Sequence, residues 1–289
     1  MAVKRVQTMP GINGLAVGQT ATQELPIGPR YHVIWICASS GILTAAQMFN
    51  EFRLKVNGKT QRVMSPTELE ALNKLNGAQY ANQTEVVSAG VTNIVRIPIF
   101  LAEPWRKQQA AQEGLAWATG DVATFQLEMD VKAGITVPTV YCVGEVDNSF
   151  IVGKNNKSQN QGLGLITKWY RQILPITGNS ADITNLPRLD AYQSIHFIDP
   201  AITNVRVLVE SLTIRDVLKG SNDATLTARD LVPVSAQFDL VFDHDDILNS
   251  ALPMEANGSR VNDFQVKLTS SSGTARNIVT MLQRIGPAD

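Results

Sequence analysis

The residues of this chain best suited to metal chemistry form an acidic cluster. Asp239, Asp243, Asp245 and Asp246 lie around His244. Carboxylates at this spacing can bind calcium, a hard cation that prefers oxygen ligands. The cluster lacks the glycine and the closing glutamate of an EF-hand loop. A solvated loop after a strand therefore competes with a calcium site formed by Asp243, Asp245 and Asp246.

The three histidines, His32, His196 and His244, show no spacing typical of an enzyme. His32 and His196 lie in strand-like segments, where packed or hydrogen-bonded side chains are the simpler interpretation. No His-x-Glu, paired-cysteine or His-x₃-His spacing indicates zinc. A Ser-His-Asp triad forms only in space, so sequence cannot exclude one, but no nucleophile elbow indicates it. The sequence predicts no enzyme, no catalytic residue and no cofactor apart from the calcium hypothesis.

Cysteine placement and the N-terminus indicate where the chain is made. Cys37 and Cys142 lie in apolar strand-like segments and are predicted to be buried free thiols, which fits synthesis in a reducing compartment. No segment has the ~20 apolar residues that a membrane span needs. Lys4 and Arg5 are followed by polar residues and Pro10 rather than by a signal-peptide core. We expect no export through an N-terminal signal.

Composition excludes some classes of protein. The 289 residues carry 25 Lys and Arg against 26 Asp and Glu, a net charge of -1. This balance argues against nucleic-acid binding through a broad basic face. A hydrophobic content of 44% excludes wholesale disorder.

The elements that must position these residues are predicted to be strands. Apolar and polar residues alternate in segments 52–57, 125–130, 238–243 and 264–269. Successive side chains of a strand point to opposite faces, so each segment has one face for a core and one for water. Three further runs, 32–37, 94–101 and 137–143, are apolar on both faces and are predicted to be central strands. Many short strands with few helices indicate a sandwich or barrel.

Two local signals predict a turn and a helix. Asn57-Gly58 lies between strand residues and predicts a type I′ hairpin turn, whose two central residues need positive φ. The same residues begin an Asn-Gly-Lys-Thr sequence, but the first glycine of a phosphate-binding loop is missing. Ser65-Pro66-Thr67-Glu68 predicts a helix start with a capping box.

A polar segment and a repeat predict two domains. Segment 153–164 is almost without apolar residues, which is typical of a linker or a long surface loop. Leu25-Pro26 before Tyr31 matches Leu186-Pro187 before Tyr192, and a strand from Phe52 matches one from Val205. After the second strand, the repeat predicts a helix over Arg215–Lys219. We predict an N-terminal domain 1–150, a linker 151–162 and a C-terminal domain 163–289.

Two well-separated blocks resemble the corticovirus-type major capsid proteins of tailless, icosahedral, membrane-containing bacteriophages. The first block consists of Met9-Pro10-Gly11, Gly18-Gln19, Glu24-Leu25-Pro26-Ile27-Gly28 and Tyr31-His32-Val33-Ile34. The second consists of Asn185-Leu186-Pro187-Arg188, Tyr192, Ile214-Arg215-Asp216-Val217-Leu218-Lys219 and Asn222-Asp223. The resemblance implies an all-β chain of two tandem eight-stranded antiparallel jelly rolls, with a few short helices in loops.

The resemblance also implies a function. The chain would form homotrimers that act as pseudo-hexagonal capsomers of an icosahedral shell over an internal viral membrane. Its partners would be neighbouring trimers, a vertex (penton) protein and the membrane with its proteins, without direct nucleic-acid contact. It would be made in the host bacterial cytoplasm, and calcium would support the virion.

Two other classes compete with the capsid hypothesis. A tandem β-sandwich carbohydrate-binding or adhesin module would expose aromatic side chains on its loops, and Trp105, Trp117 and Trp169 are the candidates. A metal-dependent jelly-roll enzyme would need a His-x-His pair, which the chain lacks.

Overall fold

The computed structural model describes residues 4–148, 150–152, 158–243, 250–256 and 259–289. The chain divides into two units. Unit 1 comprises Met1–Lys74, Ala78–Thr167 and Pro287–Asp289, and unit 2 comprises Leu75–Gly77 and Lys168–Gly286. The segment 151–162 contains most of a small hairpin of β12 (Phe150–Val152) and β13 (Ser158–Asn160). The units separate after it, between Thr167 and Lys168.

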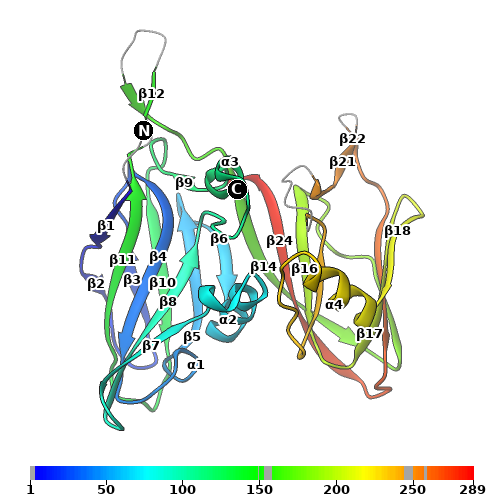
Figure 1. The fold of residues 1–289 in the computed structure, drawn as a ribbon, viewed down its shortest axis with the longest axis horizontal. Coiled ribbons are helices and arrows are strands. Elements are labelled where there is room, and N and C mark those ends of the chain that lie inside the picture. The colour runs from blue at the N-terminus through cyan, green and yellow to red at the C-terminus, as the bar shows by residue number, and fades with distance from the viewer. Residues whose placement is uncertain (1–3, 149, 153–157, 244–249, 257–258) are drawn as a thin grey trace. The chain divides into compact units, whose positions relative to one another are not determined.

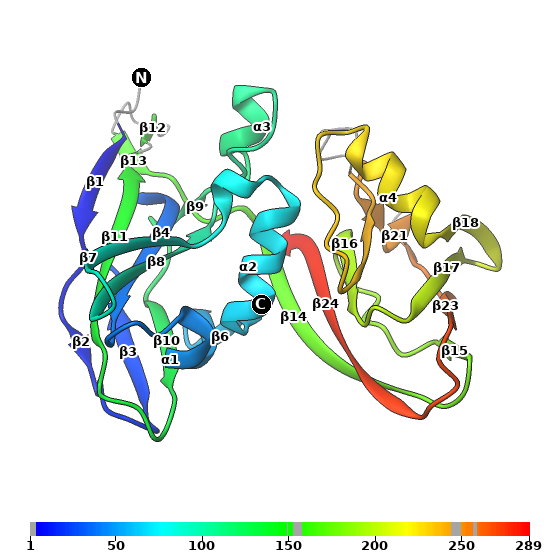
Figure 2. The same cartoon turned by 60° about the horizontal axis from the view of Figure 1, so that its bottom comes forward.

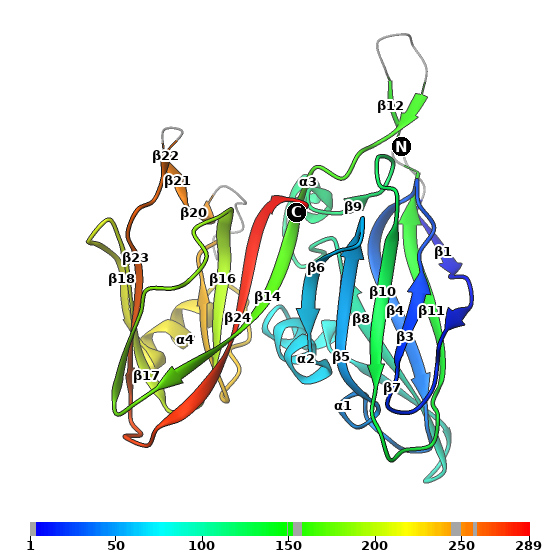
Figure 3. The ribbon, with the colours of Figure 1, turned by 180° about the vertical axis from the view of Figure 1, so that it is seen from behind.

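Unit 1 is built from eight principal strands in two antiparallel sheets (Figure 1). These strands are β1 (Arg5–Thr8), β3 (Thr20–Glu24), β4 (Arg30–Ser39), β5 (Phe49–Val56), β6 (Lys59–Met64), β8 (Thr92–Phe100), β10 (Phe125–Val131) and β11 (Thr139–Asp147). One sheet has the order β1-β11-β4-β8, and the other has the order β3-β10-β5-β6, whose strands lie side by side in Figure 3. Short strands extend these sheets: β2 (Ile12–Asn13) pairs with β3, β7 (Gln83–Ser88) with β8, and β9 (Trp117–Ala118) with β4.

Unit 2 repeats this arrangement. Its principal strands are β14 (Leu165–Ile176), β15 (Ser180–Ile183), β16 (Ala191–Ile198), β17 (Ile202–Val209), β18 (Leu212–Leu218), β19 (Phe238–Val241), β23 (Phe264–Ser270) and β24 (Arg276–Pro287). The sheets have the orders β14-β24-β16-β19 and β15-β23-β17-β18. Three short strands complete the unit: β20 (Leu252–Pro253), β21 (Glu255–Ala256) and β22 (Ser259–Arg260).

Both units have the jelly-roll strand order. When the eight principal strands are numbered along the chain, each unit has one sheet of order 1-8-3-6 and one of order 2-7-4-5. Two four-stranded sheets linked in this way define a jelly roll. The expected fold, two tandem antiparallel jelly rolls with few helices, is confirmed.

Two of the helices occupy the same place in the two rolls. The described helices are α1 (Ala45–Met48), α2 (Pro66–Leu75), a 3₁₀ turn (Ala78–Tyr80), α3 (Gln109–Glu113) and α4 (Lys219–Thr227). In each unit the fifth principal strand leads directly into a helix, β6 into α2 and β18 into α4 (Figure 2). The predicted helix over Arg215–Lys219 is wrong, because β18 continues to Leu218 and the helix begins at Lys219.

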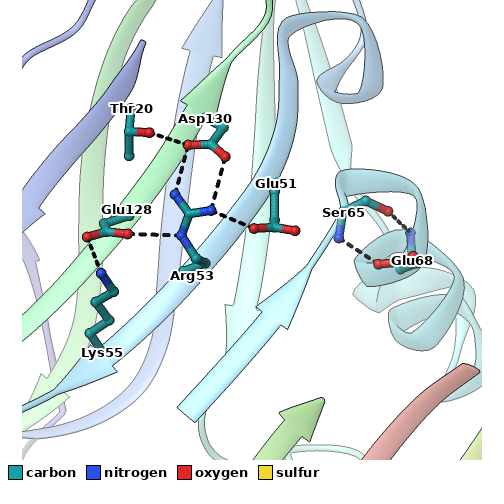
Figure 4. Close-up of polar contacts among 8 residues, drawn as sticks. All are labelled: Thr20, Glu51, Arg53, Lys55, Ser65, Glu68, Glu128 and Asp130. Atoms are coloured by element: carbon teal, nitrogen blue, oxygen red, sulfur yellow. Dashed lines mark hydrogen bonds and ion pairs between the residues drawn. The ribbon is translucent and has the colours of Figure 1, made fainter. Parts of the chain in front are cut away.

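The predicted capping box starts α2. The Ser65 amide donates to Glu68 Oε2 at 2.7 Å, and the Glu68 amide donates to Ser65 Oγ at 3.2 Å (Figure 4). These two bonds satisfy backbone donors that a helix start leaves without partners.

The hairpins between the fourth and fifth strands match in detail. In unit 1 the turn is Asn57-Gly58, with φ of 51° and 78°, and in unit 2 it is Glu210-Ser211, with φ of 49° and 63°. Both are two-residue turns with two positive φ angles, as a type I′ turn requires. The pairings Lys55 with Thr60 and Leu54 with Arg62 recur as Leu208 with Thr213 and Val207 with Arg215, so each strand pair has a bulge at the same point.

The alternating segments supply the cores. Phe52, Leu54 and Val56 are at most 1% exposed, and so are Phe125, Leu127 and Met129. Burial of each such side chain contributes roughly 1.5–3 kcal/mol. Segment 238–243 departs from the predicted alternation, because Asp239 is also fully buried. The prediction of a water-facing side for this strand is therefore wrong, because Asp239, Val241 and Asp243 are all buried. Buried polar partners replace water for the two aspartates.

The two cysteines are buried free thiols, as predicted. Cys37 lies opposite Tyr141 in the β4–β11 pair, whereas Cys142 lies opposite Ile36. Neighbouring residues of a strand point to opposite faces, so the two thiols lie on opposite faces of the sheet. Burial raises the pKa of Cys142 to about 12.

In the described part of the chain, no helix has the length and apolarity that crossing a membrane would take.

Candidate functional sites: buried polar clusters and open strand edges

Unit 2 contains a serine, a histidine and an aspartate in the geometry of a hydrolase triad. Ser194 Oγ lies 2.7 Å from His196 Nε2, and His196 Nδ1 lies 2.7 Å from Asp239 Oδ1. Ser194 and His196 are two residues apart on β16, and β19 pairs Asp239 with His196. Sequence reasoning missed this cluster, because strand pairing alone brings Asp239 to His196.

This cluster is built as part of the core. Ser194, His196 and Asp239 are 2%, 1% and 0% exposed, so a substrate cannot reach the serine hydroxyl. That hydroxyl is also held by Gln283, whose Oε1 lies 2.6 Å from Ser194 Oγ. Asp239 Oδ1 also accepts a hydrogen bond of 2.5 Å from Gln237 Nε2. A nucleophile needs a free approach to substrate, and this buried serine lacks one.

A second buried cluster joins two long strands of unit 1, β4 and β11. Asp147 on β11 accepts hydrogen bonds from Arg30, at 2.7 Å and 3.1 Å, and one of 2.8 Å from His32 Nε2. Arg30 also pairs with Glu113 at 2.9 Å, and Lys4 lies 3.4 Å from the same carboxylate. The cluster therefore fastens β4 to β11 and to α3.

The protonation states of this cluster follow from burial. Burial lowers the pKa of His32, although its hydrogen bond to Asp147 acts in the opposite direction. Its Nδ1 atom has no hydrogen-bond partner among the described residues, so a proton there would be buried without an acceptor. Burial alone would raise the pKa of Asp147, but hydrogen bonds from Arg30 and His32 hold it below its usual value.

A charged network covers the outer face of the second sheet of unit 1 (Figure 4). Arg53 bonds to Glu51, Glu128 and Asp130 at 2.6–3.1 Å, and Lys55 bonds to Glu128 at 2.5 Å. Each of these side chains is 16–26% exposed. Because the charges are paired with one another across β5 and β10, this face has no concentrated charge of one sign for an ionic ligand.

The predicted calcium ligands are only partly described. Asp243 is 6% exposed and accepts a hydrogen bond of 3.1 Å from Gln193 Nε2. Asp245 and Asp246 lie outside the described residues. Within those residues, no three His, Cys, Asp or Glu side chains gather as a metal site.

The tryptophans do not form an exposed binding platform. Trp117 and Trp169 are 0% and 4% exposed. Trp105 packs edge-on against Tyr80 and Phe100, with ring centroids 5.5 Å and 5.6 Å away. The feature that would favour a carbohydrate-binding module is therefore missing at the three predicted positions.

Apolar side chains are exposed on three edge strands. Val6 on β1 is 76% exposed, and Val86 and Val87 on β7 are 61% and 57% exposed. On β18, Leu212, Ile214 and Leu218 are 67%, 45% and 60% exposed. An edge strand offers unpaired backbone groups to another chain, and exposed apolar side chains strengthen such a contact. These edges suit assembly with other protein chains.

Solved structures share this fold. The major capsid protein P2 from bacteriophage PM2 superposes with a TM-score of 0.79 at 17% identity, over 99% of this chain and 98% of that one. The protein of Sulfolobus Turreted Icosahedral Virus gives 0.68 at 11% identity, over 98% and 90%. The PBCV-1 virus capsid gives 0.67 at 9% identity, over 99% and 94%. The fold therefore belongs to the double jelly-roll class, which these capsid proteins share.

Family models place the chain within that class. The viral coat protein P2 N-terminal domain matches residues 6–147, and the viral coat protein P2 C-terminal domain matches residues 166–286. The chain belongs to the viral coat protein P2 family. It is a structural protein of a viral capsid and not an enzyme. No curated protein sequence matches it.

Proposed function

We propose that the chain forms homotrimers that serve as pseudo-hexagonal capsomers of an icosahedral shell over an internal membrane. The observation that supports this is the repetition of one roll, with the same strand order, hairpin and following helix, in both units. Three chains of two rolls each present six similar lobes, and cyclic symmetry can close such a ring. A six-lobed ring fits a hexagonal net.

The partners of this trimer would be neighbouring trimers, a vertex protein and the enclosed membrane with its proteins. The net charge of -1 supports dense packing of many copies and disfavours direct binding of the viral nucleic acid. Two buried thiols without a disulfide are compatible with synthesis in the cytoplasm of a bacterial host.

Native mass spectrometry and sedimentation velocity of the purified full chain test this function. We expect a species of three chains at micromolar concentration, with a six-lobed outline in negative-stain images. A monomer or a dimer under these conditions would contradict the proposal.

Calcium binding at Asp243, Asp245 and Asp246 remains a prediction of the sequence. Its support is the carboxylate spacing and the behaviour implied by the family resemblance.

A further inference from the structure

One end of the unit 1 roll is formed by four segments that carry almost no charge. These segments are 14–19, 40–44, 86–92 and 132–138. β4 ends beside the starts of β8 and β11, so the segments lie at the end of the roll away from β12 (Figure 1, Figure 3). We call the surface of these four segments the unit 1 tip.

Hydrogen bonds connect the segments of the tip. Three bonds of 2.8–3.1 Å run from the Asn93 amide to the Gly41 carbonyl, from Ser40 Oγ to the Thr136 carbonyl, and from the Gly18 amide to the Val131 carbonyl. The tip is therefore one continuous surface of unit 1 and not a set of independent loops.

Every segment of the tip exposes an aliphatic side chain. The exposed side chains are Val17 (36%), Ile42 (58%), Val86 (61%), Val87 (57%), Val91 (63%) and Val137 (45%). Lys132 is the single charged residue of the four segments, whereas 18% of the whole chain is charged. The acidic residues that flank the tip, Glu85 and Asp130, are paired with Arg96 and Arg53. An exposed apolar patch of this kind marks an interaction surface.

The equivalent end of the unit 2 roll is polar. Three of its connections between principal strands, 177–179, 199–201 and 271–275, contain no large apolar residue. Arg276 Nε instead pairs with Asp199 at 2.6 Å. Because the two rolls have the same strand order, the fold itself does not require an apolar end. The apolar tip is a separate property of unit 1.

The composition of the tip indicates what kind of partner it suits. Lipid surfaces are bound through aromatic side chains at the headgroups and through Lys and Arg, but the four segments contain no aromatic residue and one lysine. Depletion of charge is typical of the core of an interface between protein chains, and interfaces between identical chains are the more apolar ones. The tip therefore suits a second copy of this chain.

The lack of charge also suits contact of the tip with itself. Near the axis of a symmetric assembly, a surface meets the same surface of the neighbouring copies, so each charge on it would face an equal charge. We infer that the unit 1 tip of each chain packs against the unit 1 tips of its neighbours around the three-fold axis. This inference rests on the proposed homotrimer and specifies its contact.

Charge substitutions at the tip test the contact. Val91→Asp and Ile42→Asp should each raise the dissociation constant of the trimer about tenfold or more, measured by sedimentation equilibrium, because like charges would meet. Ala275→Asp, at an exposed position of the polar end of unit 2, is the control and should leave this constant unchanged. Because all three side chains are exposed, circular dichroism and the melting temperature should show retained folds.

A mixture of opposite charges tests whether the tip meets itself. Val91→Lys alone should also weaken the trimer, but an equimolar mixture of Val91→Asp and Val91→Lys chains should trimerise more tightly than either variant alone. A tip that contacts a different surface would show no such recovery.

The outcomes separate this contact from the proposed function. If the wild type is a trimer but both aspartate variants remain trimeric, or the mixture shows no recovery, the tip contact is refuted and the capsomer proposal stands. If intact wild-type trimers float with phosphatidylethanolamine–phosphatidylglycerol vesicles and Val91→Asp trimers do not, the tip binds lipid and the contact between copies is refuted. A wild-type monomer refutes both the contact and the capsomer.

Discussion

Tyr31 and Tyr192 make the same hydrogen bond at the same point of the two rolls. The hydroxyl of Tyr31 donates to the Pro26 carbonyl at 2.6 Å, and that of Tyr192 donates to the Pro187 carbonyl at 2.6 Å. Both tyrosines are fully buried near the start of the third principal strand. The repeated Leu-Pro…Tyr pattern therefore marks a contact that fastens this strand to the chain before it.

Loss of either hydroxyl should destabilise its roll. We expect Tyr31→Phe and Tyr192→Phe each to lower the free energy of unfolding by about 1–3 kcal/mol, because a carbonyl loses its partner. Chemical denaturation measures the change. Tyr80→Phe keeps the ring contacts with Phe100 and Trp105 and serves as the control. Equal stability of all three variants would contradict this role.

The two type I′ turns should respond oppositely to substitution. Gly58→Val forces a β-branched residue to positive φ and should destabilise unit 1 by about 1–2 kcal/mol. Ser211→Gly removes a side chain from φ of 63° and should stabilise unit 2 by up to about 1 kcal/mol. Denaturation midpoints of the two variants provide the comparison. A lower midpoint for Ser211→Gly would show that this turn is not strained.

Local patterns were sufficient to predict the strands, the Asn57-Gly58 turn and the Ser65 capping box. Each depends on residues that are close in sequence, where spacing fixes which face or backbone group a side chain meets. The end of β18 was not predictable in this way, because Arg215–Lys219 has no cap or helical period to set the boundary.

The buried polar clusters could not be predicted from the sequence. Asp239 looked water-facing by alternation, and only the β16–β19 register places it beside His196. Likewise, Asp147 lies 115 residues from His32 in sequence. Such pairs depend on long-range strand pairing, which a single sequence does not encode in any local pattern.

Acid should weaken unit 1 in two steps. The pKa values of His32 and Asp147 are both lowered in the folded chain, so the unfolded chain takes up protons first as the pH falls. The stability that this pair contributes is therefore fully present at a pH above the ordinary histidine pKa of about 6.5. It decreases as the pH drops below that value, and decreases again below the ordinary aspartate pKa of about 3.9. The charged groups around the pair are Lys4, Arg30 and Glu113.

Unfolding curves from pH 8 to pH 3 measure this dependence for the wild type and for His32→Gln. The variant should lose the upper step and keep the lower one. Asp147→Asn should cost on the order of 3–5 kcal/mol at neutral pH, because it leaves Arg30 without its buried partner. If His32→Gln still loses stability as the pH falls below about 6.5, a group other than His32 causes that loss.

Removal of calcium should distinguish a calcium site in this segment from a solvated loop that binds no metal. If Asp243, Asp245 and Asp246 bind calcium, a chelator should lower the stability of wild-type particles, and Asp245→Asn should be insensitive to it. Thermal disassembly followed by light scattering gives the comparison, with Asp230→Asn as a control outside the cluster. Equal stability in every condition would remove the hypothesis.

The Ser194–His196–Asp239 cluster should behave as a structural element despite its triad geometry. A fluorophosphonate probe should not label the folded chain, because Ser194 Oγ is buried and is held by Gln283. Ser194→Ala should lower the free energy of unfolding by about 1–3 kcal/mol, since both His196 Nε2 and Gln283 Oε1 lose a partner. Thr225→Ala, at an exposed hydroxyl on α4, is the stability control. If the probe labels Ser194 in the native chain and Ser194→Ala is as stable as the wild type, the cluster is a reactive site instead.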